Sequence, residues 1–94
     1  MSRSILDLLR QKIRSRDYVM TLHAEEEMDQ DELSIFDVES AILTGRIVAR
    51  QRDVRTAERK YLVRGTTVGG DQAVVVAVKL GPTGKLVILT VYVE

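Results

Sequence analysis

The 94-residue chain contains no cysteine and no tryptophan, and only one histidine, one proline and one phenylalanine. Without cysteine, the chain can form neither a disulfide framework nor a thiolate-bound metal site. Aromatic residues make up only 4% of the sequence, so the core must be built mainly from Val, Ile and Leu. A chain of this length has room for one core, and we expect residues 1–94 to form a single domain.

Long apolar runs and a targeting segment are also missing. The longest apolar run, Ala73 to Val78, is far shorter than the roughly 20 residues of a membrane-spanning helix. Near the start of the chain, Asp7 interrupts the apolar residues and Arg10 follows them, a pattern that does not fit a signal peptide. The lack of cysteine fits a reducing compartment. These features predict a cytoplasmic protein with no membrane partner.

The formal net charge is zero, but the charges are segregated along the chain. Residues 1–16 carry five basic groups and one acid, residues 17–45 carry nine acids and no Lys or Arg, and residues 46–64 carry seven basic groups and two acids. One interpretation is a dipolar surface with an anion-binding face. The alternative is that acidic helices lie against basic strands and neutralise them within the fold.

Hydrophobic spacing predicts three helices in the first half of the chain. Ser4, Thr21 and Ser34 are suited to N-cap positions, and Ser34 with Asp37 resembles a capping box. The second helix is expected to end near residue 31 and the third to cover residues 35–44. Gly45 is expected to end the third helix at its C′ position.

After residue 45 the hydrophobic period changes from that of a helix to that of a strand. Four strands are predicted at residues 46–53, 59–66, 72–80 and 85–93, whereas residues 18–20 are interpreted as an extended connector. The short connections between the strands predict antiparallel pairing. The expected fold is therefore α+β, with two or three N-terminal helices on one face of a four-stranded antiparallel sheet. The other sheet face is expected to be partly open.

Basic residues gather on the first two predicted strands. Simple alternation places Arg46, Arg50 and Arg52 on one face, and it places Lys60 and Arg64 together as well. Clustered cations of this kind suit phosphate groups, which makes Arg50, Arg52, Lys60 and Arg64 candidate RNA-binding residues. The alternative is a solvated strand face that discourages edge-to-edge aggregation.

The last predicted strand has a mixed face. Alternation places Thr90 and Tyr92 on the same face as Leu86 and Ile88, and Lys79 and Tyr61 can approach from neighbouring strands. Side chains of Lys, Tyr, Thr and Arg can bind and polarise a phosphodiester without a metal. The alternative is that Tyr92 packs as an ordinary sheet residue.

His23 is the only side chain expected to titrate near neutral pH. Glu26 and Glu27 follow it at positions i+3 and i+4 of a helix, where a carboxylate can hold the imidazole ring. This arrangement suits a general acid or a phosphate-binding cation, and the alternative is a structural or simply exposed histidine. No second His and no Cys accompanies it, so we expect no metal site and no cofactor.

The segments Thr21–Met28 and Leu33–Glu39, followed by Gly45, resemble a bacterial and archaeal family described as domain of unknown function 4258. The shared pattern is a His-Ala pair, a Glu and a Met on one helix, then a Ser that opens a helix containing Asp-Val and ending in Gly. Tyr61–Val63, the Val-rich third strand and Leu86–Tyr92 match as well, so the resemblance covers about residues 5–93.

That family is grouped with the barnase, EndoU, colicin and RelE-like fold, which contains metal-independent ribonucleases and toxins. Some relatives are encoded beside zinc-finger antitoxins. The resemblance implies an RNA substrate, a cognate antitoxin as partner, and a cleavage site built from His23, Lys79, Thr90 and Tyr92. Where family members commonly carry arginines around the His-Ala pair, this chain has Glu25, Glu27 and Asp31. An active and a degenerate ribonuclease are therefore both open, and a non-catalytic protein–protein interaction module is the alternative function.

Overall fold

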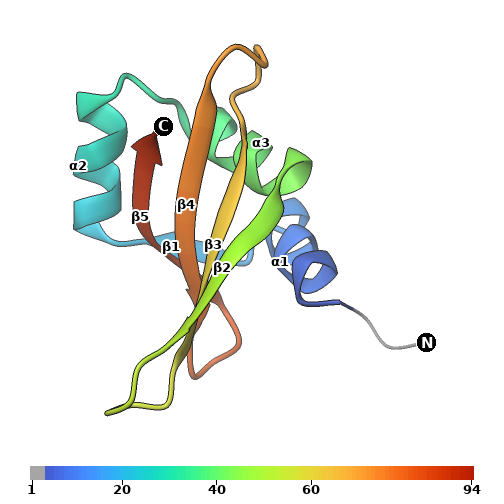
Figure 1. The fold of residues 1–94 in the computed structure, drawn as a ribbon, viewed down its shortest axis with the longest axis vertical. Coiled ribbons are helices and arrows are strands. Elements are labelled where there is room, and N and C mark those ends of the chain that lie inside the picture. Colours follow the sequence, from blue (N-terminus) through green and yellow to red (C-terminus); the bar gives the residue numbers. More distant parts are fainter. Residues whose placement is uncertain (1–3) are drawn as a thin grey trace.

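The computed structural model describes residues 4–94 as three helices and a five-stranded mixed sheet (Figure 1). The sheet order is β1-β5-β4-β3-β2. The elements in chain order are α1 (Ile5–Arg14), β1 (Tyr18–Met20), α2 (Leu22–Gln30), α3 (Ile35–Thr44), β2 (Arg46–Arg52), β3 (Arg59–Thr66), β4 (Ala73–Leu80) and β5 (Leu86–Val93).

The three predicted N-caps are confirmed. The Ser4 hydroxyl accepts a hydrogen bond from the backbone N–H of Asp7, and the Thr21 hydroxyl accepts one from Ala24, each at 3.1 Å. At α3, Ser34 and Asp37 form a complete capping box. The pKa of the Asp37 carboxyl is lowered, first because it accepts a hydrogen bond from the backbone N–H of Ser34. Each helix start is thus decided by residues within one turn of each other.

The prediction of a four-stranded antiparallel sheet is wrong in one respect, because residues 18–20 form a fifth strand. β1 pairs parallel to β5, with Tyr18 opposite Leu86 and Met20 opposite Ile88. A three-residue strand has no recognisable period, and its partner is almost at the other end of the sequence. The connector interpretation failed because only the folded chain brings these two segments together.

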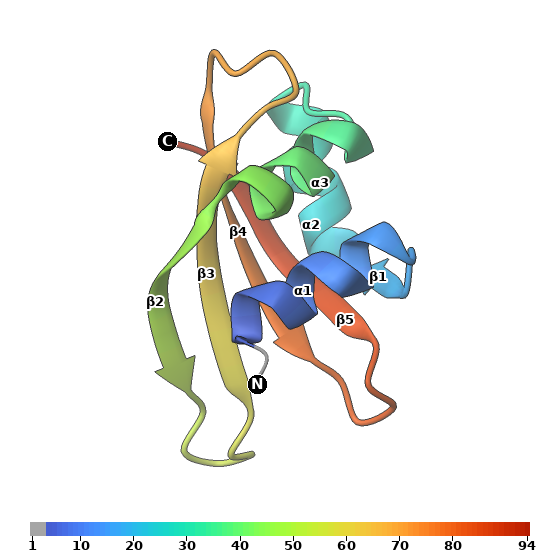
Figure 2. The same ribbon diagram turned by 90° about the vertical axis from the view of Figure 1, so that its right-hand side faces the viewer.

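The helices cover one face of the sheet and leave the other face partly open, as the sequence predicted. In Figures 1 and 2, α1 and α3 lie on one face and α2 lies beside β5. The main core lies between the helices and this face; its fully buried members include Leu9, Val38, Ile42, Val63, Val76, Val78, Leu86, Ile88 and Val91. None of these helices, within residues 4–94, is long and apolar enough to cross a membrane.

Gly45 ends α3, but for a different reason from the one expected. Its backbone is extended, with φ −91° and ψ −170°, so no left-handed conformation calls for glycine. A Cβ atom at this position would lie 2.4 Å from the carbonyl oxygens of both Ala41 and Arg64. Glycine is therefore required because the end of α3 passes directly against the backbone of β3.

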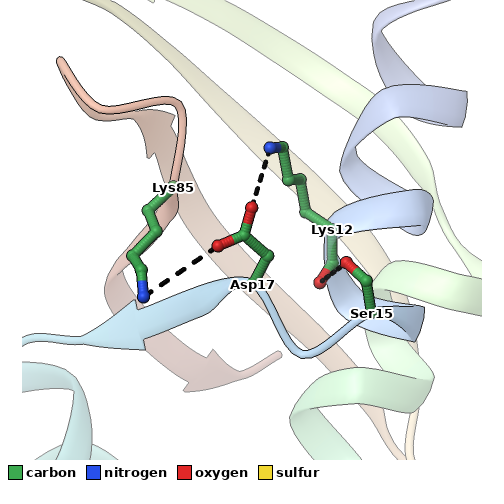
Figure 3. A network of polar contacts seen from close by, with 4 residues as sticks. All are labelled: Lys12, Ser15, Asp17 and Lys85. Carbon is green, nitrogen blue, oxygen red and sulfur yellow. Dashed lines mark hydrogen bonds and ion pairs between the residues drawn. The ribbon is translucent and has the colours of Figure 1, made fainter.

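An ion-pair network joins α1 to the start of β1 and the start of β5 (Figure 3). Asp17 contacts Lys12 Nζ at 2.9 Å and Lys85 Nζ at 4.0 Å, and the Ser15 hydroxyl donates to the Lys12 carbonyl. The hydrogen bond from Lys12 is the main reason that the pKa of Asp17 is lowered. These contacts help to hold β1 in register, since the Asp17 carbonyl also accepts from the backbone N–H of Leu86.

Tyr18 provides a test of how β1 is held. Its hydroxyl donates to Glu39 Oε2 on α3 at 2.6 Å, and burial followed by this bond raises the pKa of Tyr18 to about 12. A raised pKa in the folded state stabilises the protein below pH 10, and this stabilisation is lost as the pH rises from about 10 to 12. We expect Tyr18→Phe to lower the free energy of unfolding at pH 7, by about 1 kcal/mol.

Urea unfolding of both proteins at pH 7 and pH 11.5 measures this effect. The difference in stability between the wild type and Tyr18→Phe should shrink at the higher pH. A difference that stays constant or grows would show that the hydroxyl–carboxylate bond does not contribute in this way.

Candidate functional site

A β-bulge at Val48 controls the direction of the basic side chains on β2. Ile47 is opposite Val63, but Ala49 is opposite Leu62, so the alternation shifts by one residue between them. Because paired residues share a face, Arg46 points to the open side of the sheet, whereas Arg50 and Arg52 point to the helix side. The prediction that these three arginines share one face is wrong, because an inserted residue reverses strict alternation.

A second bulge, at Leu89, likewise shifts the alternation of side chains on β5 by one residue. Val78 is opposite Ile88, and Ala77 is opposite Thr90, which leaves Leu89 unpaired. Val91 therefore enters the core, and Thr90 and Tyr92 point to the open face. The prediction that Thr90 and Tyr92 share a face with Leu86 and Ile88 is also wrong. The bulge removes two polar side chains from the core-facing side of β5 and brings Val91 and Val93 to it in their place.

A hollow of about 260 Å³ lies on the helix side of the β2–β3 hairpin. It is lined by Arg50, Gln51, Arg52, Arg59 and Tyr61. Register explains this grouping, because Arg50 is opposite Tyr61 and Arg52 is opposite Arg59. In Figures 1 and 2 this hairpin extends to the bottom of the view, beyond the helices, so no helix covers its far end.

Tyr61 connects the hollow to the core. Its side chain belongs to the core cluster, and the residue is only 5% exposed. Its hydroxyl makes no hydrogen bond with any residue in the range 4–94. Every fully buried side-chain oxygen or nitrogen in that range does have a hydrogen-bond partner, so the Tyr61 hydroxyl is not fully buried. The hydroxyl must therefore reach solvent, and Tyr61 is one of the residues that line the hollow.

The cations of β2 and β3 are not neutralised by the acidic helices. We use the name cationic hairpin for Arg46, Arg50, Arg52, Arg59 and Lys60, which make no ion pair or side-chain hydrogen bond within residues 4–94. The acids in the same hairpin are engaged elsewhere, since Glu58 pairs with Lys79 and Asp53 accepts from the backbone of the turn. Of the two interpretations of the charge pattern, the structure therefore favours segregated surfaces over internal neutralisation.

The open face holds most of the other candidate residues. Register places Lys60, Arg64 and Lys79 on it, together with Thr90 and Tyr92. Two of these cations are already paired: Arg64 Nε with Glu94 at 2.9 Å and Lys79 Nζ with Glu58 at 2.7 Å. Between the polar residues lie Leu62, Val75 and Ala77, which face away from the helices and are not part of the main core.

His23 lies on the first turn of α2, at the outer edge of β5. Its Nε2 is 3.3 Å from Glu27 Oε1, and the same oxygen accepts a hydrogen bond from the backbone N–H of Val91 at 3.0 Å. The Thr21 hydroxyl donates to the Leu89 carbonyl beside it. Thr21 and Glu27 thus form hydrogen bonds with backbone groups of β5, along the part of its edge that β1 does not cover. Glu27 also holds the His23 imidazole, which is 67% exposed.

The four candidates for catalysis fall into two places. His23 is at the outer edge of β5, whereas Thr90, Tyr92 and Lys79 share the open face, where Lys79 lies near the end of β4 and is already paired with Glu58. No hydrogen bond or ion pair in the described part of the chain joins any two of the four. The closest link is through the chain, since Val91, which is bonded to Glu27, lies between Thr90 and Tyr92.

The candidates for RNA binding also divide between the two sides of the hairpin. Arg50 and Arg52 line the hollow, whereas Lys60 and Arg64 lie on the open face. Arg59 was not among the predicted RNA-binding residues, and Tyr61 was expected beside Lys79, whereas register places it on the opposite face of the sheet. The expectation that Glu26 or Glu27 holds the His23 ring is confirmed for Glu27. Arg59 and Tyr61 are two residues apart on β3 and therefore share a face. This places them beside Arg50 and Arg52 only once the bulge on β2 is known.

Metal chemistry finds no support in the arrangement of ligands. No group of three or more His, Cys, Asp or Glu side chains within residues 4–94 is placed to hold a metal ion. Glu27 is the acidic residue that contacts His23, at 3.3 Å. The chemistry that this chain offers is that of guanidinium groups, hydroxyls and one imidazole.

The fold and its surfaces define an α+β protein in which a helical half covers one sheet face and an unneutralised basic hairpin extends beyond it. The family model for domain of unknown function 4258 matches residues 20–93, and the chain belongs to this family. The search of curated proteins and the search of solved structures found no match to the chain.

Proposed function

We propose that this protein binds RNA through the cationic hairpin. The observation that supports it most strongly is the set of five cations on two paired strands that have no carboxylate partner within residues 4–94. Unneutralised guanidinium and ammonium groups attract a phosphate backbone, and they release its counterions when it binds. A single-stranded RNA fits this surface better than a duplex, because a flexible RNA strand can follow either side of a narrow hairpin.

Cleavage of the bound RNA is the second part of the proposal. It draws on the resemblance to toxin-type, metal-independent ribonucleases, in which a ribose 2′-hydroxyl loses its proton and attacks the adjacent phosphorus. The bond from phosphorus to the 5′-oxygen of the next nucleotide breaks, that oxygen takes up a proton, and a 2′,3′-cyclic phosphate remains. Such a reaction needs groups that transfer protons and a cation that stabilises the charge of the transition state. His23, oriented by Glu27, is the proton-transfer group in this proposal, and the cationic hairpin, which β4 separates from β5, holds the RNA away from the reacting phosphate. Because the two lie on different elements, mutation can separate binding from cleavage.

The test compares wild type with His23→Ala on single-stranded RNA in excess EDTA. We expect wild type to bind and cleave the RNA, and His23→Ala to bind equally well but cleave about 100-fold more slowly or worse. Fluorescence anisotropy measures binding and a denaturing gel measures cleavage. Because His23 is mostly exposed, the variant should keep its stability within about 1 kcal/mol.

Different outcomes remove different parts of the proposal. Equal cleavage by both proteins would eliminate His23 as the proton-transfer group. Binding without cleavage by the wild type would leave a degenerate ribonuclease that retains its RNA surface. No binding at low salt, by a protein shown to be folded, would reject the proposed function.

A second candidate function is a non-catalytic module that binds a partner protein, such as a cognate antitoxin. The open sheet face favours it, because no helix covers Leu62 and the 39%-exposed Tyr92, and unpaired Arg46 and Lys60 border them. An apolar strip with a cationic border suits an acidic, amphipathic segment. Recovery of a discrete complex with such a protein, together with absence of RNA binding, would favour this function.

A further inference from the structure

We infer that the hollow beside Tyr61 is a subsite for a terminal phosphate, so that the protein recognises a phosphorylated end of RNA. The inference rests on the proposed function and specifies its ligand. It depends on three features of the hollow: its charge, its size and its single hydroxyl.

The charge of the hollow exceeds what an internal phosphodiester would neutralise. Arg50, Arg52 and Arg59 all line it, no carboxylate lines it, and none of the three has another partner in the described chain. An internal phosphodiester carries one negative charge. A phosphate monoester carries between one and a half and two charges near neutral pH, since its second pKa is roughly 6, and it offers three terminal oxygens. Three guanidinium groups around one hollow match the monoester better.

The size of the hollow points to the same ligand. At about 260 Å³ it is smaller than the pockets of roughly 300–1,000 Å³ that enclose drug-sized molecules. It can accept a phosphate and part of a ribose, but a continuous RNA strand would have to enter and leave it. An RNA whose terminal phosphate lies in the hollow has to enter it but not to leave it again.

Tyr61 adds a directional donor. The residue belongs to the core and lines the hollow, and its hydroxyl has no hydrogen-bond partner among residues 4–94. A buried ring loses little freedom when its hydroxyl donates to a ligand oxygen, so this contact is preorganised. The arginines around it supply the charge-assisted bonds that a phosphate favours.

The neighbouring residues on β3 provide a matched pair of variants. Arg59 and Lys60 are adjacent in sequence and both are basic, yet Arg59 lines the hollow and Lys60 points to the opposite face. Removing either charge should weaken RNA binding in general. Only the loss of Arg59 should weaken the preference for a phosphorylated end.

The experiment measures competition by three unlabelled RNAs of one sequence, carrying a 5′-phosphate, a 3′-phosphate or hydroxyls at both ends. A labelled RNA serves as the probe, at pH 7.5 in EDTA, with His23→Ala as the background so that cleavage does not interfere. We expect one phosphorylated RNA to bind about tenfold more tightly than the RNA with hydroxyl ends. The better of the two identifies the end that is recognised.

Three variants complete the test in the same background. Arg59→Gln and Tyr61→Phe should each reduce the preference several-fold, whereas Lys60→Gln should weaken the binding of all three RNAs alike and keep the preference.

Equal binding of the three RNAs to the parent protein would overturn the terminal-phosphate inference and leave RNA binding intact. Binding of none of them would reject the proposed function, and the inference with it. A preference that Lys60→Gln removes and Arg59→Gln leaves unchanged would place the phosphate on the open face and overturn the assignment to the hollow.

Discussion

Gly65→Ala is expected to destabilise the protein by roughly 3 kcal/mol or more, the largest effect of any small substitution in the sheet. A Cβ atom at this position would lie 1.9 Å from the carbonyl oxygen of Ala41 and 2.8 Å from its Cα atom. Both atoms belong to the backbone of α3, so no side-chain rotation relieves the contact. The helix would have to move away from β3, and with it the fully buried Val38 and Ile42.

Denaturant unfolding followed by circular dichroism measures this loss. Gly81→Ala is a suitable control, because a Cβ atom there would meet Val87 and Lys85 at 3.4 and 3.5 Å, which is ordinary contact. Total stabilities of about 5–15 kcal/mol are usual for domains, so Gly65→Ala should remove a large part of the free energy of unfolding and lower the denaturant midpoint clearly, whereas Gly81→Ala should not. Similar losses in the two variants would mean that α3 does not pack against β3 as closely as the structure shows.

Replacement of Arg50, Arg52 and Arg59 by glutamine is expected to weaken RNA binding by about 100-fold. Each exposed charge pair with a phosphate contributes about 1 kcal/mol in a high dielectric, which corresponds to about fivefold in affinity. The three side chains line one hollow and have no ion-pair or hydrogen-bond partner in the part of the chain that the structure describes, so no such contact is lost in the variant. Fluorescence anisotropy with single-stranded RNA over a series of salt concentrations gives both the affinity and its salt dependence.

The salt series provides a second, independent check. For single strands the slope of log affinity against log salt is roughly −0.7 per phosphate contact, so the slope should become shallower in the triple variant by about 0.7 for each phosphate that the three arginines contact. Arg14→Gln is the matched control, since Arg14 is an exposed α1 residue without a partner in the described chain. An affinity for the triple variant that stays within about twofold of the control would show that RNA does not use the hollow.

Much of the secondary structure could be predicted because its signals are local. Ser4, Thr21 and the Ser34–Asp37 pair each act on a backbone group three residues away, so their effect is visible in a short window of sequence. The change from helical to strand period at Gly45 is equally local. These features also implied the two-layer arrangement, because amphipathic helices must cover one face of an amphipathic sheet.

The candidate site was predicted less well, because it depends on which side of a strand each residue faces. One inserted residue reverses every later side chain, and such insertions occur at Val48 and Leu89. The first separates Arg46 from Arg50 and Arg52, and the second moves Thr90 and Tyr92 to the open face. Neither bulge has a strong local signal, although a Thr and a Tyr at the end of an apolar strand face were at odds with burial there.

The sequence alone therefore determined the caps, the order of helices and four of the strands, and the separation of acidic from basic segments. Interactions between neighbouring residues decide all of these. Only the tertiary structure decided that residues 18–20 pair with β5, that two bulges redirect the polar side chains, and that three arginines meet around Tyr61. These features depend on the pairing of segments that are distant in the chain. Such pairing follows from the combined requirement to fill the core and satisfy the strand edges, which no single segment expresses.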